Sequence, residues 1–235
     1  MVVWSQVALA GVWGGLLALE RRAFLQAMFS RPLVAATGMG LLLDDVPSGL
    51  FVGMVLELFH LGGAALGASL PENDTVAATC TSAAAAAMAH GVGGTPAIWS
   101  SALLLFLGTG RLGRLLERSL ERYSSRLATK AMEVAEGGNL TRAVRQNLWA
   151  MWPIFVCFGA LTAACAVMGF FLAPTLRALP LPVVRGLAWA YPAMASVAAA
   201  IAVRGSHARH PLVYAGAAVA AVTCVAAFFA LRGGI

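Results

Sequence analysis

The stretch LELFHLGG, residues 56–63, sets the main constraint on this chain, because it places the carboxylate of Glu57 inside an otherwise apolar segment. The polar cluster PENDT, residues 71–75, follows soon after it. An ionisable side chain at membrane depth is costly, so it usually faces the protein interior or a water-filled path and marks a route for substrate or ions. Glu57 is therefore the leading candidate functional residue.

The composition indicates an integral membrane protein. Apolar residues make up 60% of the 235 residues, charged residues only 11%, and the mean hydropathy is +0.81. Ordinary soluble domains contain about 25% charged residues. We expect one all-α membrane domain over 1–235, with an N-terminal part at 1–110, a polar loop at 111–147 and C-terminal spans at 148–235. The four cysteines have no metal-ligand or disulfide spacing, so no metal site is expected.

Six segments are long and apolar enough to cross a bilayer, which takes about 20 residues: 1–19, 50–70, 76–107, 148–172, 183–203 and 212–231. The third is long enough for a tilted span plus a broken piece. Between the first two, the apolar run Pro32–Leu43 is too short to cross and predicts a re-entrant or interfacial segment. The acidic pair Asp44 and Asp45 is expected to cap the turn that follows it.

Lysine and arginine mark the loops expected in the cytoplasm. They cluster around Arg21, Arg22 and Arg31, between Arg111 and Arg145, and near residues 204–209. With six crossings, both termini and the turn at 71–75 are expected outside. The net charge of +6 is explained by these loops and gives no indication of nucleic-acid binding.

The polar loop at 111–147 predicts a cytoplasmic amphipathic helix. Its apolar residues recur at helical spacing, and four basic residues form a ladder with a period of four: Arg118, Arg122, Arg126 and Lys130. Two interpretations remain open. The helix either lies on the membrane surface, where the ladder contacts lipid, or presents the ladder as a docking site for a soluble partner.

Several motifs in order give a resemblance to a known family. They are SRPLVA at 30–35, GLLLDD at 40–45, SGL at 48–50, GMVLEL at 53–58, LGAS at 66–69 and EGGNLT at 136–141. With these the chain resembles the IIC component of the mannose-type (mannose/fructose/sorbose) sugar phosphotransferase permeases. The likeness covers mainly residues 9–87 and rests on hydropathy alone beyond residue 148.

The resemblance implies a multi-pass subunit of the bacterial cytoplasmic (inner) membrane that carries a hexose across the bilayer. It implies a hetero-oligomer with a IID membrane subunit, supplied with phosphate through IIA and IIB proteins. No phosphoryl transfer is expected in the IIC chain itself, and no cofactor. Because no phosphate-binding glycine motif occurs, ATP-driven transport by this chain is not expected either.

Four residues are the candidate sugar site: Glu57, His60, Asn73 and Asp74. Glu57 and His60 are three residues apart, so they share a helix face on which the imidazole can contact the carboxylate. A carboxylate accepts hydrogen bonds from sugar hydroxyls, and an asparagine both donates and accepts. The alternatives are structural: Glu57 can satisfy the backbone of a broken helix, His60 can be a packed side chain, and Asn73 or Asp74 can cap the helix that begins near Thr75.

Two departures from the family pattern leave the function itself open. The family usually has Pro-Pro-Asp or Ala-Pro-Asp near residue 71, and an apolar or aromatic residue at the position of His60. The chain is therefore either a transporting subunit or a degenerate IIC relative that senses sugar or docks a IIB-type regulator. An intramembrane hydrolase built on Glu57 and His60 is disfavoured, because no nucleophile or metal set accompanies them.

Overall fold

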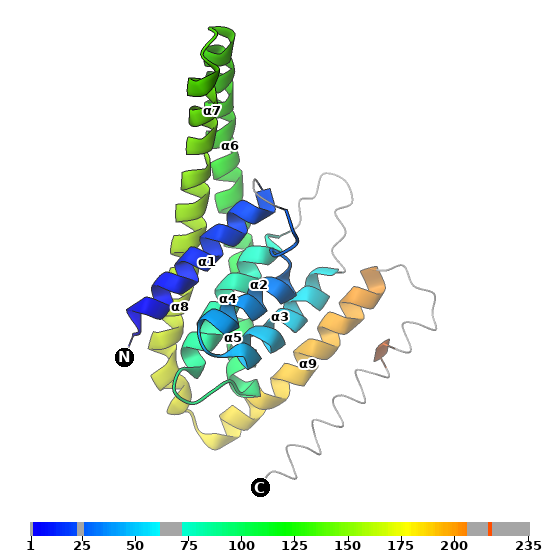
Figure 1. Ribbon diagram of the computed structural model, residues 1–235. Helices are drawn as coiled ribbons and strands as arrows, with labels where there is room; N and C mark the ends of the chain where they lie inside the picture. The colour runs from blue at the N-terminus through cyan, green and yellow to red at the C-terminus, as the bar shows by residue number, and fades with distance from the viewer. Residues whose placement is uncertain (1, 23–25, 62–71, 206–215, 218–235) are drawn as a thin grey trace.

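A computed structural model describes residues 2–22, 26–61, 72–205 and 216–217. The regular structure of these residues is entirely helical, which confirms the expected all-α class. Most of the expected span at 212–231, the end of the one at 50–70 and the LGAS motif at 66–69 lie outside the described residues. Figure 1 shows a body of packed helices from which one helical hairpin projects.

Two consecutive short helices form a re-entrant hairpin, as the apolar run at 32–43 predicted. Helix α2 spans Pro32–Leu42 and α3 spans Val46–Leu61. At 1.5 Å per residue they are about 16 and 24 Å long, less than the hydrocarbon thickness of about 30 Å. Glu57 contacts Arg31, so the chain leaves the hairpin at the end where it entered. The expected complete span at 50–70 is therefore, over its described residues, the returning arm of this hairpin.

The tip of this hairpin is fixed by buried polar groups. Asp45 accepts hydrogen bonds from the Ser48 backbone nitrogen at 3.4 Å and the Ser48 hydroxyl at 2.5 Å, which confirms the expected cap. The indole nitrogen of Trp99 donates to the same hydroxyl at 2.9 Å. Close packing needs glycine here: a Cβ on Gly49 would lie 2.3 Å from the Ala36 carbonyl oxygen.

A second pair of short helices follows, α4 at Asp74–Ala89 and α5 at Pro96–Phe106. The long apolar segment at 76–107 is thus broken, as its length suggested. Helix α4 is the centre of the body, because every residue from Thr75 to Ala89 is buried. Its small side chains allow close approach: a Cβ on Gly169 would lie 2.5 Å from the Ala84 carbonyl oxygen.

The turn before α4 lies at the end opposite to the one expected. The Asn73 backbone nitrogen donates to the Gly110 carbonyl at 3.2 Å, and Asp74 pairs with Arg21. The predicted separation of this turn from the basic loops is therefore wrong. Both short-helix pairs return the chain to the end of the body where it entered. Neither pair therefore counts as a single crossing, and the count of six crossings that placed this turn outside no longer holds.

Three longer helices complete the body. Helix α1, Trp4–Arg22, and α4 pack on α8, Met151–Arg177, while α3 and α5 pack on α9, Leu181–Gly205. By length and composition, the apolar stretches Leu140–Arg177 and Leu181–Ala202 can each cross a membrane. The first contains the span expected at 148–172, and the second contains all but the last residue of the span expected at 183–203.

The projecting arm consists of α6, Thr109–Glu136, and α7, Leu140–Trp149, which pack side by side (Figure 1). The turn between them uses Gly138, whose φ of +82° favours glycine, and Asn139, whose side chain accepts from the Arg142 backbone nitrogen at 3.1 Å. The ladder residues are exposed along α6. The expected amphipathic helix is therefore present, as one half of a hairpin.

The close contact at Gly49 gives a testable prediction. Gly49→Ala drives a methyl group into the backbone of α2 and should lower the free energy of unfolding by about 1–3 kcal/mol. Gly186→Ala in α9 is the control, because nothing lies within 4 Å of its added Cβ. Thermal unfolding of the purified variants measures the difference, and equal melting temperatures would contradict the close packing.

Candidate functional site

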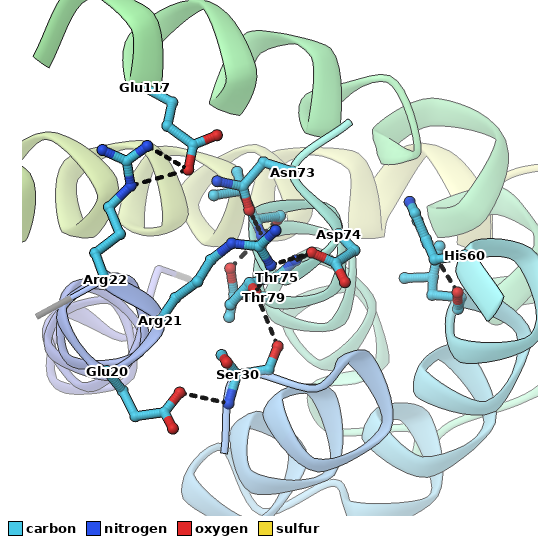
Figure 2. A network of polar contacts seen from close by, with 12 residues as sticks. Glu20, Arg21, Arg22, Ser30, His60, Asn73, Asp74, Thr75, Thr79 and Glu117 are labelled. Carbon is cyan, nitrogen blue, oxygen red and sulfur yellow. Dashed lines mark hydrogen bonds and ion pairs between the residues drawn. The ribbon is translucent and has the colours of Figure 1, made fainter. Parts of the chain in front are cut away.

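Four helix ends meet in a polar network at the arm end of the body. They are the C-terminal ends of α1 and α3 and the N-terminal ends of α2 and α4, as Figure 2 shows in part. Helix ends carry unpaired backbone groups and partial charges, so they attract polar side chains when they lie inside an apolar body.

Arg21 is the hub of this network (Figure 2). Its guanidinium pairs with the Asp74 carboxylate and donates to the Thr75 hydroxyl at 2.8 Å. The Thr75 hydroxyl in turn donates to the Ser30 carbonyl at 2.8 Å. One side chain at the end of α1 therefore joins the start of α4 to the segment that leads into α2.

Glu20 belongs to this polar network, although the candidate residues chosen from the sequence did not include it. Only 6% of it is exposed. Its Oε2 accepts from the Ser30 backbone nitrogen at 2.9 Å, and its buried Oε1 has no hydrogen-bond partner among the described residues. The buried face of α1 repeats through Val7, Gly14 and Leu17. Glu20 is three residues beyond Leu17 and falls on the same face, so this helical period could have predicted that Glu20 is buried.

The carboxylate of Glu57, on α3, lies beside the first turn of α2. It is paired there and is not a free group facing a route for substrate. Its Oε1 accepts from Arg31 at 2.8 Å and its Oε2 from the Leu33 backbone nitrogen at 3.2 Å. Its side chain is 16% exposed, whereas that of Arg31 is 51% exposed. Both carboxylate oxygens of Glu57 thus accept a hydrogen bond. One of the two donors, the Arg31 side chain, is half exposed to solvent. Arg31 follows Ser30 directly, so Glu57 and Asp74 belong to one connected network.

His60 does not make the expected contact with Glu57. Its Nδ1 donates to the Leu56 carbonyl at 2.8 Å, and its ring packs edge-on against Phe59. The opposite nitrogen, Nε2, is buried and has no partner among the described residues. With the proton on Nδ1, Nε2 is left as a hydrogen-bond acceptor.

Asn73 and Glu72 have the structural contacts of a helix start. The Asn73 side chain accepts from the Val76 backbone nitrogen at 3.0 Å, which confirms the expected cap of α4. Glu72 accepts from Arg111 Nε at 2.7 Å, and this hydrogen bond raises the pKa of the Arg111 guanidinium. The start of α4 is thereby tied to the base of α6.

Hydrogen-bond acceptors predominate among the groups of this network that lack a partner or pair with arginine. Two buried acceptors, Glu20 Oε1 on α1 and His60 Nε2 on α3, have no partner among the described residues, and the Glu57 and Asp74 carboxylates accept from arginines. Hydroxyl groups donate to such acceptors without bringing a charge into the site. Within the described part of the chain, no group of three His, Cys, Asp or Glu side chains is placed to hold a metal ion.

Comparison with known proteins places the fold and the family. Two solved structures are similar, each 19% identical in sequence and each covering 99% of this chain. One, described as a membrane protein, is covered over 95% of its length with a TM-score of 0.70. The other, the mannose transporter ManYZ in complex with microcin E492, is covered over 94% with a TM-score of 0.60. At this identity they show a shared fold.

No curated protein matches the sequence. The family described as the sorbose-specific IIC component of the phosphotransferase system matches residues 4–231, almost the whole chain. This match confirms the resemblance carried by the motifs between residues 30 and 141. The chain belongs to the sorbose-specific IIC family of the phosphotransferase system and is a multi-pass membrane protein of the sugar-permease type.

Proposed function

We propose that this chain binds a hexose and carries it across the bacterial inner membrane, together with a IID membrane subunit, for phosphorylation by a IIB protein supplied by IIA. The proposal rests mainly on the meeting of short-helix ends in a partly buried polar network. Transporters commonly bind substrate where broken helices end inside the membrane, because their free backbone groups and dipoles face the ligand. The family of the chain supports the same conclusion.

The proposed sugar site consists of Glu57, Asn73, Asp74 and His60, with Glu20 added. Glu57 and Asp74 accept from arginines in this structure, so sugar hydroxyls would replace or share these contacts. Glu20 Oε1 and His60 Nε2 are acceptors that a sugar can use without breaking any described bond. The half-exposed Arg31 is the group most easily displaced, because an ion pair in contact with solvent is weak and the released guanidinium is rehydrated.

A non-transporting sensor or docking platform is the second candidate. It is favoured by one observation: the carboxylates of Glu57 and Asp74 already have arginine partners. A locked network of this kind would bind sugar without moving. Transport and sensing therefore differ in whether these ion pairs open.

The basic ladder on α6, one of the two helices of the arm, is the proposed docking site for the IIB protein. Arg118, Arg122, Arg126 and Lys130 are exposed, and the structure gives them no ion-pair partner among the described residues. Because α6 packs with α7 and projects from the body (Figure 1), it is presented to a soluble partner and does not lie across the end of the body. Four like charges on one helix attract an acidic surface and steer its approach.

Transport is tested by uptake in cells that lack their own mannose-type system. Expression of the chain with IID, IIA and IIB should give saturable uptake of a hexose, such as mannose, and accumulation of its phosphate. Omission of IID should abolish both. Sugar binding by the purified assembly without uptake would contradict transport and favour the sensor.

Glu57→Gln tests the sugar site. The substitution keeps the shape but removes charge-assisted bonds, so hexose affinity should fall by about 1.5–3 kcal/mol for each bond lost. Glu133→Gln, on the exposed part of α6, is the control. Calorimetric binding and thermal unfolding are measured on the same purified complex. Normal affinity with a lowered melting temperature would show that Glu57 only caps α2.

Neutralising the ladder tests the arm. Replacement of Arg118, Arg122, Arg126 and Lys130 by glutamine should weaken IIB binding at least about tenfold at low salt and remove its salt dependence. Replacement of Arg142 and Arg145, on α7, is the control. Binding is measured by surface plasmon resonance over a range of ionic strength. Unchanged IIB affinity together with weaker binding to anionic vesicles would assign the ladder to lipid.

A further inference from the structure

A row of exposed apolar side chains runs along α7, the helix of the arm that does not carry the basic ladder. Leu140, Val144 and Leu148 recur every fourth residue and are 68%, 61% and 56% exposed. Helix α7 packs on α6 with the small side chain of Ala143 buried, and it leaves these larger side chains outside. The row is the α7 ridge. Apolar side chains gathered on an exposed surface mark a site that another molecule covers.

The α7 ridge continues without a break into the part of the chain that crosses the membrane. Trp152 and Val156 of α8 follow Leu148 at the same spacing, and both are more than half exposed. Helix α7 runs into α8 along nearly one line (Figure 1), and together they form a stretch of 38 residues. Leu148 and Trp152 also line an apolar groove of about 390 Å³ between α8 and α1. The ridge and the groove therefore form one apolar surface.

Neither lipid nor a soluble protein covers the whole of this surface. Exposed tryptophans concentrate at membrane interfaces, so Trp149 and Trp152 mark that level. At 1.5 Å per residue, Leu140 lies about 14 Å beyond Trp149 along the helix, whereas the headgroup region of one leaflet is about 6 Å deep. Because the arm projects from the body (Figure 1), acyl chains do not reach Leu140. A soluble protein, in turn, cannot follow the surface into the bilayer as far as Val156.

The charges beside the α7 ridge disfavour a second copy of the chain. Arg142 and Arg145 are exposed on α7 and have no ion-pair partner among the described residues. No acidic residue follows Glu136 in the sequence. Two copies that met along their ridges would bring four arginines together with no carboxylate on either α7 or α8. A partner with carboxylates at these positions is attracted instead.

We infer that this surface binds a membrane-spanning helix of the IID subunit, which leaves the bilayer beside α8 and continues along α7. Its membrane part lies in the groove between α1 and α8. Its cytoplasmic part packs apolar side chains on the α7 ridge and presents carboxylates to Arg142 and Arg145. Side chains four residues apart form a ridge of the kind that packs between the ridges of a second helix. The inference rests on the proposed function in one respect, namely that a IID subunit accompanies the chain.

Photo-cross-linking in cells that express the chain with IID and IIB identifies the occupant. Photoreactive benzoylphenylalanine in place of Val144 should cross-link to IID, whereas the same replacement of Met132 should not. Met132 is the matched control, because it is also exposed and apolar but lies on α6 of the same arm. An adduct of position 144 with a second copy, with IIB or with lipid alone would overturn the inference, and so would the absence of any adduct.

Charge placed in the α7 ridge measures its contribution to assembly. The double variant Leu140→Arg, Val144→Arg should reduce the IID that co-purifies with the chain at least about tenfold, because the new charges would be buried without partners. Met132→Arg should have no such effect, and neither change should alter the melting temperature of the chain expressed without IID. Equal co-purification of IID with the double variant would overturn the inference and leave the proposed function intact. Failure of IID to co-purify with the unmodified chain would contradict both.

Discussion

The ion pair between Arg21 and Asp74 holds together the part of the structure on which the rest depends. The body contains two pairs of helices too short to cross a bilayer, and the ends of such helices must be satisfied inside an apolar environment. Arg21 does this for the start of α4 and, through Thr75 and Ser30, for the entry to α2. Glu57 does the same for the first turn of α2.

This network pairs most of its polar groups but leaves two buried acceptors without a partner in the described part of the chain. Most of its groups have a protein partner, which the low dielectric of the interior requires. Glu20 Oε1 and His60 Nε2 do not have one among the described residues. Unpaired buried acceptors are costly, so a ligand that donates hydrogen bonds gains affinity by pairing them. The short-helix ends that arginines satisfy in this structure are the groups that the proposed sugar would contact.

Neighbouring arginines connect this network to the arm. Arg21 contacts α4, and Arg22 contacts Glu117 and Glu121 on α6. Glu72 and Arg111 form a second link between the start of α4 and the base of α6. The base of the arm is therefore linked by ion pairs to residues of the proposed sugar site. This short path gives the proposals a common structural basis without any long-range mechanism.

The sequence by itself determined the class of the protein, the re-entrant segment, the amphipathic helix and the cap at Asn73. These features depend on hydropathy, period and capping chemistry within a few turns of chain, all of which are local. The tertiary structure alone decided that Glu57 binds Arg31, that Asp74 binds Arg21, that His60 turns away from Glu57, and that the turn before α4 lies beside the basic loops. Partners such as Arg21 and Asp74 are far apart in sequence, and which helix ends meet depends on how the short-helix pairs reverse the chain. Hydropathy shows that a segment is apolar. It does not show whether that segment crosses the body or turns back to the end where it entered.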